Sequence, residues 1–565
     1  MQDIVEPKAR STTPADVRAE LRRLLVDDGP ALVIADEGHT IKNIASQLTT
    51  MVKRLATRAR ICLTGYPLQN NLEEYWTMID FCYPGYLSDL GNFRNRFVHP
   101  IKNGLYSDST TLDKRRSTLQ LHALQRLLET LVDRRDSSVL RHQLPRKVEY
   151  NISCPLTPVQ HELYRRYLGW ISGSGELSAI GRAASNVKLF EHGTILEIIC
   201  NHPAVCRHVQ RELWRKASSL AAVQDDDDAA ELAELAGPDP PLTPDSAGSG
   251  RVAEWCRATF AAHAHAAPLD DSAGAPLVDD VQRPEHSTKV MLLLDIVRES
   301  VKLGERVLVF SRSVPTLDYL QWIVESTGAA RPEGLARDDP DGRTLRIDGS
   351  TLSNKRQELI NRFNDRASRH HVFFITSKTG SIGINLVAAS RVVLFDVGWN
   401  PLYDDQAVAR AYRYGQTRRV YVYRLMTTGT WENHLFKNNM FKVGMTRRVV
   451  DKQTMGRRTS REDSKRYFQL PPAAFEAIPD DRIAELTSEN EDDHVLAAIL
   501  ARHAAALAKV TPRATLLANE DDNVVIDENE LRAVLLMEQR RLGLLPPESL
   551  VALPPQPPTA PPSPL

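Results

Sequence analysis

Short apolar runs that end in polar residues recur along this chain, and helical patterns separate most of them. Continuous apolar runs of this kind are typical of strands buried in a parallel sheet, and their alternation with helices is typical of βαβ units. The pattern therefore predicts an α/β protein. The predicted strands are residues 31–36, 60–64, 306–310, 344–347, 372–376, 391–395 and 420–425.

The stretches between these groups have a different character. Residues 72–200 follow a mainly helical periodicity, with breaks expected at prolines 84, 100, 145 and 155. Residues 215–285 combine an aspartate run with proline-rich and alanine-rich sequence, which predicts a mostly disordered insertion. Residues 454–545 resemble a helical appendage, and the proline-rich end should be unstructured.

Composition narrows the class of protein. With about 150 residues per domain, 565 residues allow three or four domains. A content of 42% hydrophobic and 25% charged residues is ordinary for a soluble globular protein, and no apolar run approaches the ~20 residues that cross a bilayer. The N-terminus lacks a secretory h-region, and six cysteines fit reduced thiols of a cytosolic or nuclear protein. The net charge of −1 neither favours nor excludes nucleic acid.

Three motifs carry candidate chemistry. Asp36-Glu37-Gly38-His39 follows the first predicted strand, at the sheet edge where ligands bind in open parallel sheets. One carboxylate there could hold Mg²⁺ and the other could orient or deprotonate a water, although a solvated acidic loop would have the same sequence. Residues 63–71, LTGYPLQNN, place hydroxyl and amide groups at the same edge, or form a capped turn.

The third motif is basic. On a helix, Gln406, Arg410 and Arg413 would share one face at positions i, i+4 and i+7. Two guanidinium groups on one face could clamp phosphate oxygens as charge develops, and the alternative is a solvated basic face paired with acids.

Together these segments resemble superfamily-two helicase motors, and specifically the SWI/SNF-family DNA translocases, in the order in which that family carries them. Residues 93–104, residues 444–453 and Tyr66 resemble the branch of ATRX and the androgen-receptor-interacting remodeller. The matching stretches are ADEGHTIKN (35–43), LTGYPLQNNLEEYW (63–76), ICNHP (199–203), KVMLLLDIV (289–297), VLVFSRS (307–313), RIDGSTLSNKRQELINRFN (346–364), TSKTGSIGINLVAASRVVLFDVGWNP (376–401) and QAVARAYRYGQTRRVYVYRL (406–425).

The resemblance implies two RecA-like lobes, the first incomplete, with ATP and Mg²⁺ between them. Asp36 would coordinate Mg²⁺, Glu37 would activate water, and His39 would couple the first lobe to the LTGYP motif. Arg410 and Arg413 would be arginine fingers, with Gln406 beside them. Gly380, Gly383 and Asn385 would lie in a loop near the nucleotide and the DNA. The residues expected to face DNA are Ser311, Arg312, Ser350, Thr351, Lys378 and Trp399.

One departure from the family pattern concerns the phosphate-binding loop. No G-x-x-x-x-G-K-[ST] sequence occurs in this chain, and only 35 residues precede Asp36. A truncated gene model, a split gene or a pseudoenzyme would each explain this, and we expect truncation. The first lobe would then expose a sheet edge.

Resemblance and composition together predict six segments along the chain. They are the C-terminal part of a first RecA-like lobe (1–85), a helical family-specific insertion (86–210), an acidic disordered insertion (211–285), a second RecA-like lobe (286–453), a helical extension (454–545) and a disordered tail (546–565).

Several other features have alternative interpretations. Cys200, His202, Cys206 and His208 have a spacing that matches no common zinc finger, and packing is the favoured interpretation. Residues 412–424 could stack bases but more simply contain a buried strand. The basic run 446–466 could touch DNA or an acidic nucleosome surface, or could brace the lobes. The acidic insertion could bind histones or act as a passive linker.

The sequence therefore predicts an ATP-dependent translocase on double-stranded DNA, a nuclear chromatin remodeller. Its predicted partners are nucleosomes and transcription factors, with no membrane association. The alternative is a non-catalytic DNA- or chromatin-binding module, because the phosphate-binding loop is missing.

Overall fold

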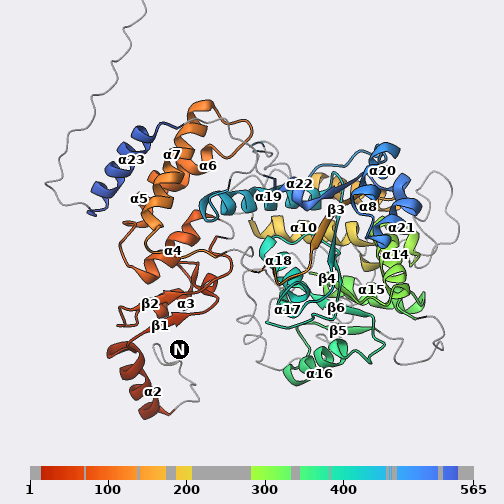
Figure 1. Ribbon diagram of the computed structural model, residues 1–565, viewed down its shortest axis with the longest axis horizontal. Helices are drawn as coiled ribbons and strands as arrows, with labels where there is room; N and C mark the ends of the chain where they lie inside the picture. The colour runs from red at the N-terminus through yellow and green to blue at the C-terminus, as the bar shows by residue number, and fades with distance from the viewer. Residues whose placement is uncertain are drawn as a thin grey trace, which may run out of the picture. The chain divides into compact units, whose positions relative to one another are not determined.

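The computed structural model resolves the chain into two units, each described by itself (Figure 1). The first unit consists of Met1–Ser138, Met440–Arg461 and Leu517–Leu565, and the second of Val139–Asn439 and Glu462–Leu516. The structure describes residues 14–68, 71–135, 140, 142–173, 186–206, 282–332, 344–380, 383–453, 457, 460, 468–518 and 526–544. Nearly all of the predicted insertion (211–285) and the whole predicted tail (546–565) lie outside these ranges.

Two short parallel strands form the sheet described in the first unit. Strand β1 (Val33–Ala35) pairs with β2 (Arg60–Cys62), with Ile34 opposite Ile61. Helices α2 (Ala15–Arg22), α3 (Gln47–Lys53) and α4 (Leu72–Cys82) flank the strands in the chain. Both strands were predicted as buried, and that part of the prediction is wrong. Their residues alternate, so that Ile34 is 56% and Ile61 44% exposed, because the described part of the unit covers only one face of the sheet.

The rest of the first unit, where the structure describes it, is mainly helical, as the periodicity predicts. Its core contains Phe93, Phe97 and Leu124, all fully buried. Pro100 does not break the chain's helical path, because it occupies the first turn of α6, where proline lacks no needed hydrogen bond. Helix α23 packs beside α7 from far along the sequence. The elements are α5 (Leu90–Phe93), a π-helical turn (Arg94–Val98), α6 (His99–Asn103), α7 (Thr111–Leu128) and α23 (Glu528–Arg541).

The second unit is built on a seven-stranded sheet with the order β5-β6-β4-β7-β8-β3-β9, in which β9 alone is antiparallel to its neighbour. The predicted α/β class, with its dominant parallel sheet, is confirmed. Strands β3 and β9 were not predicted. The strands are β3 (Lys147–Cys154), β4 (Val307–Ser311), β5 (Leu345–Ile347), β6 (Val372–Thr376), β7 (Arg391–Leu394), β8 (Val420–Thr427) and β9 (Lys509–Pro512).

Helices cover both faces of this sheet. Alternate residues of β4 show the arrangement: Val307 and Val309 belong to one apolar core, and Leu308 and Phe310 to another. The first core is closed by α8 (Pro158–Gly173), α10 (Asn186–Asn201), α14 (Thr288–Lys302), α15 (Val314–Ser326) and α21 (His494–His503). The second is closed by α16 (Ser353–Asn364) and α18 (Pro401–Ala411). The remaining helices are α17 (Ser377–Gly380), α19 (Trp431–Val449), α20 (Asp480–Glu489) and α22 (Arg513–Leu516).

No helix in the described ranges is long and apolar enough to span a membrane. Helix α19 contributes its residues up to Asn439 to the second unit and those from Met440 to the first.

The buried ICNHP segment uses its histidine for packing. His202 is 0% exposed, and its Nδ1 accepts a hydrogen bond from the Ala204 N–H at 3.0 Å. Its Nε2 therefore carries the proton and donates to the Arg283 carbonyl at 2.9 Å, beside the Tyr319 hydroxyl. Both ring nitrogens are used within the protein. Of the other three residues considered for zinc, Cys200 and Cys206 are buried and His208 lies outside the described residues.

Burial lowers the pKa of His202 from 6.5 to about 3, so acid should destabilise the second unit through this residue. Its contribution to the free energy of unfolding is fully present above pH 6.5 and is lost as the pH falls towards 3, at about 1.4 kcal/mol per pH unit for one proton. We expect His202→Gln to lose less stability than the parent chain between about pH 7 and about pH 5 in urea unfolding. The exposed His494→Gln should behave like the parent, and an unchanged loss in His202→Gln would contradict the assignment.

Candidate functional site

An acidic loop follows β1 at the carboxyl end of the first unit's parallel strands. Glu37 adopts the left-handed conformation (φ 49°, ψ 48°), and its N–H donates to Asp36 Oδ1 at 2.8 Å. The Thr40 N–H donates to the Glu37 carbonyl at 2.9 Å and starts the 3₁₀ turn Gly38–Ile41. Left-handed backbone at a residue other than glycine is uncommon and clusters at functional sites. Both carboxylates are exposed at this edge.

Hydrogen bonds join this loop to the end of the second strand. The Gly38 N–H donates to the Leu63 carbonyl at 2.8 Å, and the Leu63 N–H donates to the Ala35 carbonyl at 2.8 Å. The prediction that the DEGH and LTGYP motifs meet at one sheet edge is therefore confirmed. His39 Nδ1 lies 3.2 Å from Glu37 Oε2, and burial lowers the pKa of His39 although Glu37 opposes the shift. Gln69 and Asn70 of the second motif lie outside the described residues.

Gly38 is required by the packing beneath the loop. A Cβ on this residue would stand 2.0 Å from Cys62 Sγ, far inside van der Waals contact, whereas the Cys62 Cβ would be 3.6 Å away. The acidic loop therefore rests directly on the Cys62 thiol.

In the second unit, the residues predicted to face DNA follow the carboxyl ends of four neighbouring parallel strands. Arg312 comes after β4, the Ser350–Thr351 turn after β5, Lys378 after β6 and Trp399 after β7. Because these strands are parallel and adjacent, the residues after them emerge at one edge of the sheet. Lys378 is exposed, and Arg312, Thr351 and Trp399 are partly buried.

Ser311 differs from its neighbours because it is fully buried. Its hydroxyl donates to Asp396, whose carboxylate also accepts the Arg312 N–H at 3.0 Å. Arg312 Nη1 pairs with Glu197 Oε2 at 2.9 Å. Burial raises the pKa of Glu197 to about 8, against the effect of Arg312. Ser311 therefore helps to position Arg312 through Asp396. Its own hydroxyl is not exposed, so it does not face DNA directly as predicted.

A buried lysine lies behind this edge. Lys289, 1% exposed, donates through Nζ to Glu432 Oε1 at 2.6 Å, to Asn201 Oδ1 at 3.0 Å and to the Phe395 carbonyl at 3.2 Å. Burial acts to lower the pKa of Lys289, but Glu432, Cys200 and Asp396 together outweigh burial and the pKa is raised. Asn201 Nδ2 lies 3.4 Å from Asp396 Oδ2, so the lysine network reaches the group that holds Ser311.

The turn after β5 is ordered by its own carboxylate. Asp348 Oδ1 accepts the Ser350 N–H at 3.0 Å and the Ser350 hydroxyl at 2.6 Å. The Arg356 Nε–H donates to the Thr351 carbonyl at 2.7 Å, which ties the turn to α16. Although burial opposes the shift, the bonds from Ser350 and the nearby Arg346 lower the pKa of Asp348.

The predicted helical face of Gln406, Arg410 and Arg413 is only partly formed. Gln406 and Arg410 lie on α18, but this helix ends at Ala411, so Arg413 lies beyond it and the prediction of one shared helix face is wrong. Gln406 is also buried, at 8% exposure. Helix α18 ends at Ala411 because of Gln416, whose Nε2 donates to the Val387, Ala389 and Ala411 carbonyls at 2.8–3.1 Å. These bonds hold the chain after Ala411 in a turn.

That turn brings the basic residues to the loop around residue 384. Arg413 Nη1 donates to the Ile384 carbonyl at 3.3 Å, and the Leu386 N–H donates to the Arg410 carbonyl at 3.0 Å. Gly380, at the end of α17, belongs to the same connection between β6 and β7. The structure therefore brings together four of the residues predicted near the nucleotide, Gly383, Asn385, Arg410 and Arg413.

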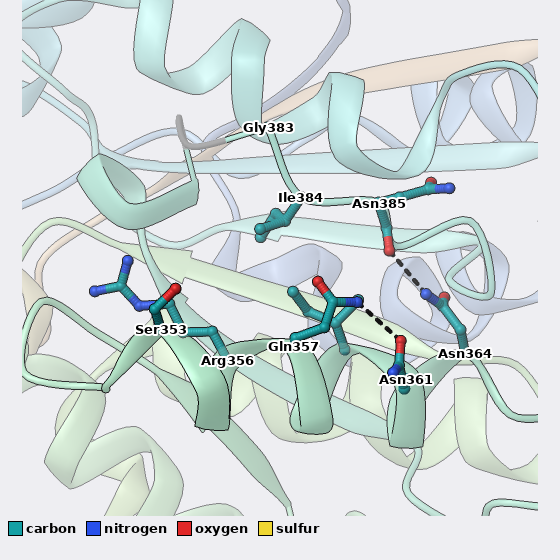
Figure 2. A pocket seen from close by; sticks show the side chains of 9 residues that line it. Ser353, Arg356, Gln357, Asn361, Asn364, Gly383, Ile384 and Asn385 are labelled. Atoms are coloured by element: carbon teal, nitrogen blue, oxygen red, sulfur yellow. Dashed lines mark hydrogen bonds between the residues drawn. The ribbon is translucent and has the colours of Figure 1, made fainter.

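A pocket of about 460 Å³ lies between this loop and α16 (Figure 2). Side chains of α16 line it from below, and Asn364 Nδ2 donates to the Asn385 carbonyl at 2.8 Å. The Ala388 N–H donates to Asn364 Oδ1 at 3.3 Å. Asn364 therefore fixes the loop to the helix. The residues that line the pocket are Ser353, Arg356, Gln357, Ile360, Asn361, Asn364, Gly383, Ile384 and Asn385.

Glu197, Asp396, Arg356 and Asn364 are among the residues of these sites that were not singled out from the sequence. Asp396 had a detectable signal, because it is an acid placed directly after an apolar strand. Within the described ranges, no three histidine, cysteine or acidic side chains are arranged to hold a metal ion. Mg²⁺ on a nucleotide requires only one or two carboxylates, and the exposed, adjacent Asp36 and Glu37 meet that requirement.

Comparisons with known proteins match both units. A profile for the SNF2-related domain matches residues 22–210, and one for the helicase conserved C-terminal domain matches residues 288–415. The chain is 30% identical to Transcriptional regulator ATRX of Homo sapiens, covering 95% of this chain and 24% of that protein. It is 36% identical to Helicase ARIP4 of Homo sapiens, covering 77% of this chain and 30% of that protein. The chain thus spans about a quarter to a third of the length of these relatives.

Among solved structures, the chain is similar to the "Sulfolobus solfataricus SWI2/SNF2 ATPase core in complex with dsDNA". The TM-score is 0.33 and the sequence identity is 22%, over 74% of this chain and 69% of that chain.

The contact between Gly38 and Cys62 can be tested by a double-mutant cycle. Gly38→Ala should lower the free energy of unfolding by about 1–3 kcal/mol, because the new methyl group overlaps the Cys62 sulfur. In a Cys62→Ala background the same change should cost much less, since the overlapping atom is gone. Urea unfolding of the four chains measures the coupling, and equal costs in both backgrounds would refute it.

Proposed function

Because this chain belongs to the SNF2-related family of helicase-like proteins, we propose that it forms much of an ATP-driven motor that translocates on double-stranded DNA. Members of this family are generally DNA-dependent ATPases. The proposal extends that activity to this chain, with chromatin remodelling in the nucleus as its use. Nucleosomes and transcription factors are the proposed partners, in keeping with a relative described as a transcriptional regulator.

The acidic loop is the observation that carries the proposed ATPase activity. Asp36 and Glu37 stand exposed at the carboxyl end of a parallel strand, and Glu37 is held in a left-handed conformation. Asp36 would hold Mg²⁺, which neutralises charge on the nucleotide phosphates when bound. Glu37 would orient the attacking water and accept its proton, while His39 keeps the Glu37 carboxylate in place.

The basic end of α18 would serve the same reaction from the second unit. Arg410 and Arg413 would stabilise the charge that develops on the transferred phosphoryl group, as guanidinium groups do in other nucleotide hydrolases. Their bonds to the loop around residue 384 would link this charge stabilisation to a loop near the DNA. Gln406, which is buried, would position the helix.

The carboxyl edge of the second unit's sheet would be the DNA-binding surface. Arg312, Lys378 and the Ser350–Thr351 turn offer guanidinium, ammonium and hydroxyl groups, which bind phosphates without reading sequence. Trp399 would add a contact beside them. Ser311 would act through Arg312, because its own hydroxyl is buried and bonded to Asp396.

A second candidate function is a DNA- or chromatin-binding module without catalysis. The observation in its favour is that the sequence contains no G-x-x-x-x-G-K-[ST] motif, whose lysine and hydroxyl hold the phosphates and Mg²⁺ in related motors.

The two functions are separated by Glu37→Gln. If the chain is a motor, its ATP hydrolysis should rise with added duplex DNA, and Glu37→Gln should lower the rate by roughly 10²-fold or more because the proton acceptor is lost. Glu20→Gln, an exposed carboxylate on α2, serves as the matched control. Binding of DNA with no hydrolysis in either the parent chain or the control would support the binding module.

The DNA surface is tested through the salt dependence of binding. Lys378→Ala should weaken binding to duplexes of any sequence, and the slope of log K against log[salt] should become shallower by roughly 0.9 for one lost phosphate contact. Lys302→Ala, an exposed lysine at the end of α14, which leads into the amino end of β4, should leave the slope unchanged. Fluorescence anisotropy over a salt series provides the measurement, and equal slopes for both variants would refute the surface.

A further inference from the structure

Two cysteines meet where β2 and α4 end in the first unit. Cys62 is the last residue of β2, and Cys82 is the last residue of α4. Arg60 fixes the two segments together: its Nη1 donates to the Phe81 carbonyl at 3.1 Å, and its guanidinium carbon lies 5.1 Å from the centre of the Phe81 ring. Both cysteines pack against the same apolar core and are partly exposed.

The two thiols interact directly and unequally. The interaction of the Cys82 sulfur with the Cys62 thiol and N–H, together with the nearby Arg60 charge, lowers the pKa of Cys82 although burial opposes the shift. The pKa of Cys62 is raised, chiefly by the same thiol–thiol bond. Cys82 is therefore the readier thiolate, and Cys62 lies against it. This is the arrangement of a redox-sensitive pair, in which an accessible thiolate has a resolving thiol beside it.

The other described cysteines differ from this pair. Cys154, Cys200 and Cys206 are buried, and burial raises the pKa of Cys154 to about 12. Such thiols are poor nucleophiles and are not accessible to an oxidant. Cys256 lies outside the described residues.

We propose that Cys62 and Cys82 are a modification site that forms a reversible disulfide when the chain meets a peroxide. The Cys82 thiolate attacks one oxygen of hydrogen peroxide, so that an S–O bond forms, the O–O bond breaks and the departing hydroxide takes a proton to become water. The Cys62 sulfur then attacks the Cys82 sulfur, the S–S bond forms, and the S–O oxygen leaves as a second water with the Cys62 proton. Two thiols and one peroxide become one disulfide and two waters, and a thiol reductant reverses the change.

The disulfide would act on the acidic loop through Gly38. Cys62 Sγ is the atom on which Gly38 rests, and bonding it to Cys82 moves that sulfur towards α4. The Gly38 N–H, which bonds to the Leu63 carbonyl at 2.8 Å, would report the change. Formation of the disulfide does not depend on the proposed ATPase activity. Only an effect of the disulfide on ATP hydrolysis would rest on the proposed ATPase activity.

The experiment treats the full chain with hydrogen peroxide, blocks free thiols with an alkylating agent and maps the digest by mass spectrometry without reduction. We expect a peptide cross-linked between Cys62 and Cys82 at oxidant levels that leave Cys154, Cys200 and Cys206 as free thiols, and its loss on addition of dithiothreitol. Cys82→Ser and Cys62→Ser should each abolish the cross-link. Independent alkylation of Cys62 and Cys82 after oxidation, or a cross-link of either to Cys256 instead, would overturn the proposal.

Hydrogen exchange of residues 38–41 tests the effect on the loop. Oxidation should change the exchange rate of the Gly38 N–H in the parent chain and leave it unchanged in Cys82→Ser, in which no disulfide can form. An unchanged rate in a fully cross-linked parent chain would overturn the coupling between the disulfide and the acidic loop.

Discussion

The second unit depends on satisfying one charged lysine that is buried away from water. Lys289 is almost fully buried, and an unpaired ammonium in such a place would cost several kcal/mol. Its position is tolerated because Glu432, Asn201 and the Phe395 carbonyl surround the Nζ atom. These partners come from α19, α10 and the end of β7, so satisfying one charge requires three distant segments to be in register. Asp396 and Arg312, at the edge proposed to bind DNA, are held by the same network.

A second cluster of ion pairs holds α18 in a comparable way. Arg424 of β8 contacts Glu149, Asp404 and Asp405, and Arg513 shares Glu149 and Asp405. Burial raises the pKa of Asp404 to about 7, which lessens the excess of negative charge among three acids and two arginines. Because Asp404 and Asp405 lie on α18, this cluster sets the position from which Arg410 emerges.

Arg513 also shows that residues 468–516 are more than an appendage. Strand β9 adds an antiparallel strand beside β3, and Asp493 of the same segment pairs with the buried Arg391 of β7. The sequence indicated only helices here. A four-residue strand has too little periodicity to be recognised, and it forms because β3 offers an unpaired edge. Strand β3 was missed for a related reason, since its position depends on pairing with β8 along its full length.

The sequence by itself determined the α/β class, strands β4 to β8 of the second unit and the meeting of the DEGH and LTGYP motifs, because short apolar runs and their polar ends are local signals. Only the tertiary structure decided where α18 stops, because the Gln416 amide bonds to carbonyls 5 to 29 residues away. It also decided that Ser311 is buried and that Cys62 lies between Gly38 and Cys82. Such contacts join segments far apart in the chain, and no local pattern of residue types encodes them.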